Sequence, residues 1–255
     1  MRTVQQILQL ILRFSHDAWG LLAALDGYYE CPKGEAGERL GPLVGYAGHY
    51  GEQNLHYVGD VYANFAVAEE EPEVLGHYVN QIMNNVLGRI PRKDIDVFCG
   101  APMGGITLAY ELARREGKRF IFSEKKVTAV ATPNSREESK LTFLRHKVRQ
   151  GERVVICEDV LNNFSTTAML IKLIEEAGGE VIAILALLNR STIFNQVYDY
   201  NGRSIPVMAM VRKRIEEYHQ DDLAVAADVA AGNVVWKPKD EWEKLKAAVS
   251  AAAAQ

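Results

Sequence analysis

Residues 153–190 read RVVICEDVLNNFSTTAMLIKLIEEAGGEVIAILALLNR, a pattern that predicts a strand, a loop, a helix and a second strand. The segment begins with the apolar, β-branched run 153–157, which is short enough to be a buried strand. Apolar residues then recur at helical spacing over 170–177, and Gly178 follows them as a helix stop. The run 181–188 is almost wholly apolar, as a strand covered on both faces of a parallel sheet must be. The pattern therefore favours an α/β fold with a parallel sheet.

Two acids, Glu158 and Asp159, stand at the end of the first of these strands. In open α/β sheets, ligands bind beyond the carboxyl ends of the strands, so chemistry is expected there. The polar loop 162–167 brings backbone N–H groups to a helix N-terminus, which attracts phosphate. Acids beside an anion site suit a ligand with phosphate at one end and hydroxyl groups at the other, such as a ribose 5-phosphate. The alternative is an ordinary strand end with solvated acids and a capped helix.

A second strand, glycine loop and helix lies upstream. The run IDVFC at 95–99 reads as a strand and is followed by GAPMGG at 100–105, and apolar residues then repeat at helical spacing over 106–113. Glycine lets the backbone approach a ligand closely, and the helix start again favours an anion. Tight packing of the strand against the helix would also explain the glycines. Two such loops in one sheet, with acids at one of them, strengthen the prediction of an anion site.

These motifs resemble a known family. VVICEDV at 154–160, with the Ser- and Thr-bearing loop and the helix after it, looks like the phosphoribosyl-diphosphate (PRPP) motif of type I phosphoribosyltransferases. The segment 100–126, which runs from the glycine loop to Ser-Glu-Lys-Lys, resembles the orotate-specific branch. The likeness is good over 94–210 and loose over the N-terminal third. It implies an α/β, type I phosphoribosyltransferase-like fold, in which helices flank a mostly parallel central sheet and a small hood subdomain is added.

The resemblance also implies a reaction and its residues. PRPP and orotate would give orotidine 5-phosphate and diphosphate, with Mg²⁺ as cofactor and without an assigned protein ligand for the metal. Catalysis would depend on Glu158 and Asp159 at the ribose hydroxyls and on Lys125 at the diphosphate. Arg190 would bind the carboxylate of the base, as a bidentate donor can, unless it is a plain surface arginine. The residues assigned to PRPP are Asn162, Asn163, Ser165, Thr166, Ala101, Met103, Gly104 and Lys126.

Two further features follow from the same resemblance. A mobile catalytic loop is expected from Val127 to about Phe143, and a homodimer is expected in which each such loop completes its neighbour's site. A phosphoribosyltransferase for another base is the first alternative to an orotate enzyme. The second alternative is a degenerate member of the family that has been retained as a ligand sensor.

Phe164 is the main departure from the family pattern, because glycine is usual at its position. Glycine permits positive φ and leaves room for phosphate, whereas phenylalanine is strained at positive φ and has a bulky side chain. If the ring points into the core, the neighbouring polar residues can still form the phosphate site. If the ring occupies the phosphate position, the sensor becomes the better interpretation.

Composition narrows the remaining classes of protein. At 255 residues and 48% apolar content, the chain can bury a core as one domain or as one with a small appendage. A net charge of −4 argues against a general nucleic-acid binder. Cys31, Cys99 and Cys157 lack metal-like spacing, so we expect reduced thiols in a cytoplasmic protein. The apolar run 7–14 is short and interrupted, which favours an amphipathic helix over a signal peptide, and we expect no membrane partner.

Three regions are expected along the chain: N-terminal helices with an aromatic hood region at 1–93, the phosphoribosyltransferase core at 94–210, and a C-terminal extension at 211–255. Residues 4–25 read as helix with a break near Ser15. The aromatic, glycine-rich region after them predicts either a cover over a ligand site or a small antiparallel cap.

Overall fold

The computed structural model describes residues 2–129, 138–193 and 196–254. No helix in these ranges is both long enough and apolar enough to cross a membrane. The three cysteines are buried free thiols, as predicted.

Contacts divide the chain into two compact units. Unit 1 comprises Met1–Leu8 and Glu69–Arg214, and unit 2 comprises Gln9–Ala68 and Ile215–Gln255. This grouping differs from the predicted division at residues 93 and 210, because helix α4 (Pro72–Asn85) belongs with the core. The predicted domain boundaries stay a prediction.

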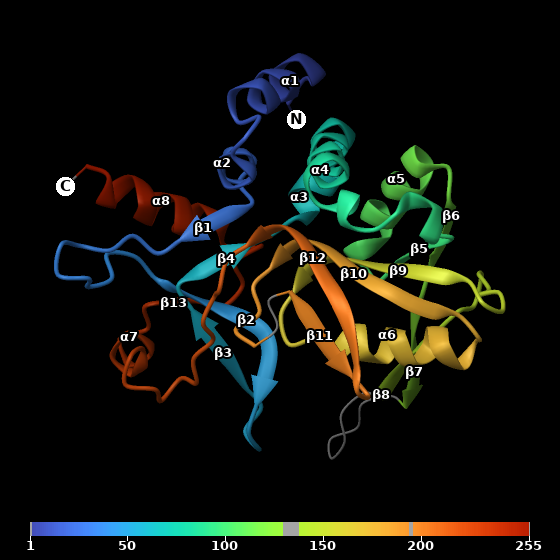
Figure 1. Cartoon of the computed structure of the whole chain (residues 1–255). Coiled ribbons are helices and arrows are strands. Elements are labelled where there is room, and N and C mark those ends of the chain that lie inside the picture. The colour runs from blue at the N-terminus through green and yellow to red at the C-terminus, as the bar shows by residue number, and fades with distance from the viewer. Residues whose placement is uncertain (1, 130–137, 194–195, 255) are drawn as a thin grey trace. The chain divides into compact units, whose positions relative to one another are not determined.

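Unit 1 is built around a six-stranded sheet with the strand order β11-β12-β10-β9-β5-β6 (Figure 1). Neighbouring strands are parallel except for β11 and β12, which are antiparallel. A mostly parallel central sheet is therefore confirmed. Its strands are β5 (Val97–Gly100), β6 (Arg119–Phe122), β9 (Arg153–Leu161), β10 (Glu180–Asn189), β11 (Val197–Tyr200) and β12 (Arg203–Arg212).

Helices flank this sheet on both faces, as predicted. Helices α4 and α5 (Gly105–Glu116) lie on one face, and α6 (Ser165–Glu176) lies on the other (Figure 1). The buried side of α6, including Leu170 and Ile174, packs in a core cluster with Val154 and Ile156 of β9. Two short 3-10 helices precede β5: η1 (Leu87–Arg89) and η2 (Arg92–Asp94).

The connections of the sheet change direction between β5 and β9. From β5 the chain goes to β6 at one edge, whereas from β9 it proceeds through β10 and β12 toward the other edge. In open α/β sheets, the crevice at such a switch point is where ligands bind. The two predicted anion loops follow these two strands, so the sheet places them next to each other.

Part of the segment predicted as a mobile loop lies in two paired strands. Strand β7 (Glu124–Ala129) pairs antiparallel with β8 (Glu138–Thr142), and Lys125 stands opposite Leu141. Valine and threonine in these strands favour extended backbone. The central part of the predicted loop, residues 130–137, lies outside the described residues.

Unit 2 holds two small sheets. Strand β1 (Tyr28–Glu30) pairs antiparallel with β4 (Val61–Ala63), and a three-stranded sheet has the order β13-β2-β3. The antiparallel pairs agree with the small-cap alternative for the aromatic region. The other elements of this unit are α2 (Ala18–Ala24), β2 (Leu43–Tyr50), β3 (Leu55–Gly59), α7 (Ala226–Ala230), β13 (Val234–Val235) and α8 (Trp242–Ala252). Helices α1 (Val4–Arg13) and α3 (Ala66–Glu69) span the boundary between the units.

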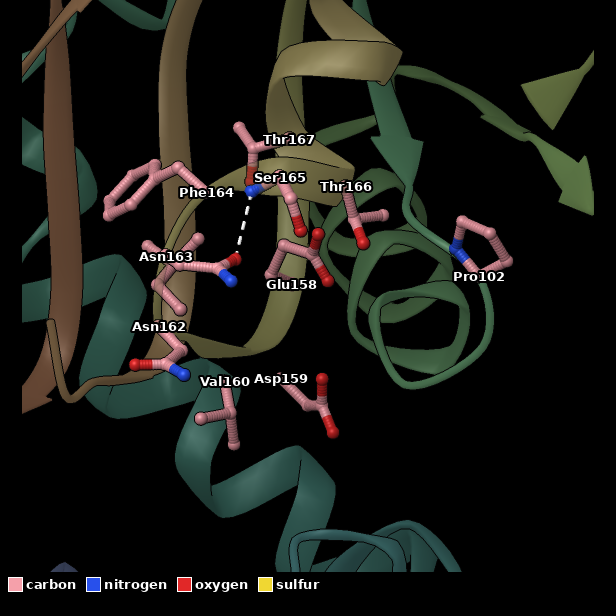
Figure 2. Close-up of a pocket in the computed structure, with 11 residues that line it drawn as sticks. Pro102, Glu158, Asp159, Val160, Asn162, Asn163, Phe164, Ser165, Thr166 and Thr167 are labelled. Atoms are coloured by element: carbon pink, nitrogen blue, oxygen red, sulfur yellow. Dashed lines mark hydrogen bonds between the residues drawn. The ribbon is translucent and has the colours of Figure 1, made fainter. Parts of the chain in front are cut away.

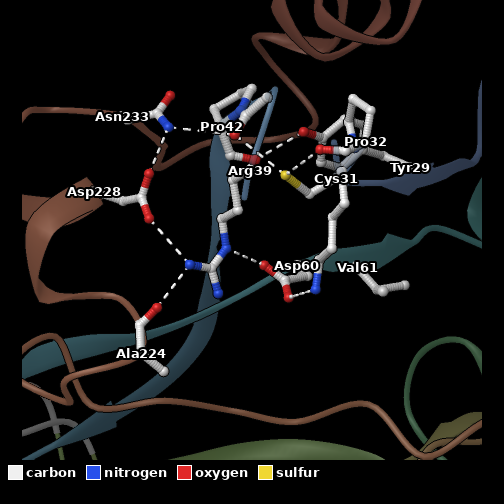
Figure 3. A network of polar contacts seen from close by, with 12 residues as sticks. Tyr29, Cys31, Pro32, Arg39, Pro42, Asp60, Val61, Ala224, Asp228 and Asn233 are labelled. Carbon is white, nitrogen blue, oxygen red and sulfur yellow. Dashed lines mark hydrogen bonds and ion pairs between the residues drawn. The ribbon is translucent and has the colours of Figure 1, made fainter. Parts of the chain in front are cut away.

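Arg39 joins the N-terminal and C-terminal segments of unit 2 (Figure 3). Its guanidinium donates to Asp60 at 2.6 Å and to Asp228 at 3.0 Å, and Lys33 reaches Asp60 at 3.0 Å. Burial alone would raise the pKa of Asp60, but the bonds from Arg39 and Lys33 outweigh it, and that pKa is lowered. The Arg39 side chain is only 14% exposed, so this ion pair is better shielded from solvent than a typical surface pair.

Candidate active site

A pocket of about 270 Å³ lies at the carboxyl end of β9 (Figure 2). Its walls are the end of that strand, the loop after it, the first turn of α6 and one residue of the loop after β5. The structure thus brings six of the predicted site residues to one cavity. The lining residues are Pro102, Glu158, Asp159, Val160, Leu161, Asn162, Asn163, Phe164, Ser165, Thr166 and Thr167.

Glu158 is the buried acid of the pair, with 7% of its surface exposed. Burial raises the pKa of Glu158 well above its ordinary value, and the charge of Asp159 adds to the rise. A hydrogen bond from the Thr167 hydroxyl acts in the opposite direction and steadies the carboxyl group. Thr167 was not predicted as a site residue. The signal for it is its place on the buried side of the first turn of α6, directly after the loop.

Asp159 lies against the loop that follows β5. A Cβ atom on Gly104 would stand 2.2 to 2.6 Å from the carboxyl atoms of Asp159, so a side chain there would displace the carboxylate. A Cβ on Gly105 would stand 1.9 Å from the backbone oxygen of Cys157, which cannot move so easily. The glycines therefore serve both alternatives considered for them: Gly104 makes room for an acid of the pocket, and Gly105 allows tight packing on β9.

The other predicted residues of the β5 loop have different surroundings. Ala101 is fully buried, and its N–H donates to the Cys157 carbonyl at 2.9 Å, so it holds the loop on β9. Met103 is 80% exposed, and the peptide bond between Pro102 and Met103 is cis. Like Gly104, these two residues are not among those that line the pocket.

Phe164 takes a left-handed conformation, with φ 61° and ψ 14°, at the start of α6. The residue is 3% exposed, and its ring stacks on Tyr198 of β11, with ring centroids 4.8 Å apart and planes 7° from parallel. Figure 2 shows the ring pointing away from the pocket. The first of the two predicted orientations is therefore the one observed. Next to it, the Ser165 N–H donates to the Asn163 side-chain oxygen at 3.1 Å.

Three predicted residues from other elements also lie outside the lining of the pocket. Lys125 and Lys126 are exposed on β7. Arg190 follows β10, and its N–H donates to the Leu161 carbonyl at 2.9 Å, which places its backbone beside the end of β9. The roles of these three residues stay predictions.

A family model described as a phosphoribosyl transferase domain matches residues 72–222, more than half of the chain. The chain belongs to the phosphoribosyl transferase domain family. This match confirms the resemblance seen in the sequence, and it covers the strand pair and both loops that form the pocket.

Curated relatives within the family include two named orotate phosphoribosyltransferase. The protein of Campylobacter hominis is 34% identical over 130 residues, which cover 51% of this chain and 58% of that protein. The protein of a Nitratiruptor species is 38% identical over 114 residues, which cover 44% of this chain and 48% of that protein. The chain thus spans about half the length of these relatives.

Solved phosphoribosyltransferase structures overlap the chain only partly. The orotate enzyme from Aeropyrum pernix is 16% identical and covers 66% of this chain and 87% of its own, with a TM-score of 0.46. The adenine enzyme from Thermoanaerobacter pseudethanolicus is 20% identical and covers 60% of this chain and 89% of its own, with a TM-score of 0.47. Both scores lie below 0.5, and neither similarity bears on the substrate.

Proposed function

We propose that the chain is an orotate phosphoribosyltransferase, which converts orotate and PRPP into orotidine 5-phosphate and diphosphate. The observation that carries the proposal is the pocket at the end of β9, where two acids and the first turn of α6 face one cavity. These groups match the two ends of a ribose 5-phosphate. The relatives named orotate phosphoribosyltransferase support the choice of base.

The 5-phosphate would bind at the first turn of α6. Backbone N–H groups and the positive end of the helix dipole favour an anion there, and Ser165 and Thr166 add hydroxyl donors. The buried ring of Phe164 leaves this space open. The Asn163 side-chain oxygen accepts the Ser165 N–H, and a phosphate oxygen would take its place.

The two acids would act on the ribose. Glu158 and Asp159 would accept hydrogen bonds from the ribose hydroxyls, and these bonds favour the ionised form of Glu158 against the rise that burial gives its pKa. The ionised acids would stabilise the positive charge that develops on the ribosyl carbon as diphosphate departs. The Asp159 carboxylate, held against the β5 loop at Gly104, is an oxygen ligand of the kind that Mg²⁺ prefers. When bound with PRPP, Mg²⁺ would neutralise charge on the departing diphosphate. The pocket also holds the two substrates in position for the transfer.

The sharpest test is calorimetric titration with Mg-PRPP, followed by an assay of orotate consumption. We expect saturable binding and formation of orotidine 5-phosphate. A panel of uracil, adenine and hypoxanthine separates the orotate enzyme from one that uses another base. Failure to bind PRPP would overturn the proposal and favour the ligand sensor. The structure itself does not favour a sensor, because the Phe164 ring points away from the pocket and does not occupy the phosphate position.

We also propose that the protein is a cytoplasmic homodimer in which one copy completes the site of the other. Lys125 and Lys126 are exposed and do not line the pocket of their own chain, which fits a role in a neighbouring site. Mixing an inactive Lys125→Ala variant with an inactive Glu158→Gln variant should then restore part of the activity. Sedimentation that shows an active monomer would contradict the dimer.

A further inference from the structure

The phosphate-loop residue Phe164 is held by a strand that is not its neighbour in the sheet. Its ring stacks on Tyr198 of β11, whereas β9, from which the loop leaves, is separated from β11 by β10 and β12. We propose that Tyr198 is a positioning residue that fixes the loop between β9 and α6 through the ring of Phe164. Its consequence for PRPP binding rests on the proposed function.

The backbone at Phe164 explains why such a contact matters. The residue is at φ 61°, a left-handed conformation that a bulky side chain adopts only when its surroundings impose it. Here the surroundings are a buried site, with 3% of the residue exposed, and a nearly parallel partner ring at 4.8 Å. Offset or stacked aromatic pairs at this distance attract each other beyond the effect of burial alone. The stack therefore stabilises the backbone conformation that points residues 162, 163, 165 and 166 toward the pocket.

Tyr198 is itself well fixed for this task. It pairs with Ile205 in the antiparallel ladder of β11 and β12, and its ring is partly buried against the core cluster that contains Phe164. Tyr200, two residues further on the same strand, packs against the same cluster. Its ring centroid lies 6.4 Å from that of Tyr198. Tyr198 is not among the residues that line the pocket, so its effect on a ligand must pass through Phe164.

The first test measures the loop itself, without substrate. Hydrogen exchange of a peptide that covers residues 158–168 should become about tenfold faster in Tyr198→Ala and remain unchanged in Tyr198→Phe, since the phenylalanine ring can still stack. Tyr200→Ala is the matched control, because it removes a similar ring from the same strand and leaves the stack in place. Equal exchange in wild type and Tyr198→Ala, or equal acceleration by both alanine variants, would overturn the proposal.

The second test asks whether the position of the loop affects the binding of PRPP. Tyr198→Ala should raise the KM for PRPP about tenfold with little change in kcat, Tyr198→Phe should restore it, and Tyr200→Ala should leave it near the wild-type value. In a Phe164→Gly background, Tyr198→Ala should have no further effect on exchange. If the wild-type protein does not bind Mg-PRPP, the proposed function fails, whereas the exchange experiment still decides whether Tyr198 positions the loop.

Discussion

The loops after β5 and β9 reach the same edge of the sheet by opposite means. Each leads into a helix N-terminus, but the first uses Gly104 and Gly105 where the second uses Phe164. Glycine is needed in the first because other atoms occupy the space that a side chain would take. In the second, the left-handed backbone is tolerated because a large side chain has a buried place away from the pocket. A glycine in a family pattern can thus mark either a crowded position or an unusual φ. A residue with a well-packed ring can replace the glycine only in the second case.

Substitution of the two acids, Glu158 and Asp159, should have the largest effect on activity. Asp159→Asn together with Glu158→Gln should reduce turnover by at least about a thousandfold, or roughly 4 kcal/mol of transition-state stabilisation. The acids serve the ligand, and the buried strand β9 does not need their charges. An assay of orotidine 5-phosphate formation measures the loss, and circular dichroism checks the fold. Full activity in the double variant would end the assignment of these acids.

Phe164 gives the next largest effect, this time on stability. Phe164→Ala should lower the free energy of unfolding by about 3 to 5 kcal/mol, because it removes a buried ring. Phe164→Gly should cost roughly 1 kcal/mol less than the alanine variant, because glycine adopts positive φ without strain. Chemical denaturation measures both. In an ordinary helix the order would be reversed, so alanine being the milder change would contradict the left-handed conformation.

The same variant tests whether the loop binds phosphate as proposed. Since the ring points away from the pocket, Phe164→Gly should leave PRPP affinity equal or weaker. A gain of tenfold or more, about 1.4 kcal/mol, would mean that the ring blocks the phosphate position in solution. That result would contradict the proposed enzyme and favour the ligand sensor.

The sequence predicts the region of the loop after β9 better than that of the loop after β5. The apolar run 153–157, the two acids that follow that run and the glycine stop are local patterns, so β9, α6 and the candidate pocket follow from them. The orientation of Phe164 depends on Tyr198, and the position of Asp159 depends on Gly104, and no local pattern relates residues so far apart. The pairing of β7 with β8 was missed for the same reason, because strand pairing depends on tertiary contacts. Thr167 was missed although its place in the first turn of α6 is a local signal.

Gly104 offers a milder way to disturb the first loop. Gly104→Ala should displace the Asp159 carboxylate and lower kcat/KM for PRPP about tenfold, with little loss of stability, because a short side chain rather than backbone has to move. Gly88→Ala is the matched control, since a Cβ there meets nothing within 4 Å. Gly104→Ala with wild-type kinetics would show that Asp159 does not need its present position.

The smallest effect concerns the pH dependence of stability at Glu158. Because its pKa is raised in the folded protein above the ordinary value of 4.5, the folded state binds more protons than the unfolded state as the pH rises from that value. Stability at this residue is therefore lost with increasing pH until the folded pKa is passed. Glu158→Gln cannot ionise and should escape the loss. Its melting temperature should therefore be similar to that of the wild type near pH 4.5 and should exceed it increasingly as the pH rises toward 7.

Bound PRPP should narrow this difference in stability between the wild type and Glu158→Gln. Ribose hydroxyls that donate to ionised Glu158 favour its charged form, so saturating Mg-PRPP should stabilise the wild type more than Glu158→Gln as the pH rises. Melting curves of both proteins between pH 4.5 and 8, with and without Mg-PRPP, provide the measurement. Parallel curves for the two ligand-free proteins would show that the burial of Glu158 carries no cost. A ligand-induced shift in melting temperature that is identical in both proteins would place the ribose elsewhere, away from Glu158.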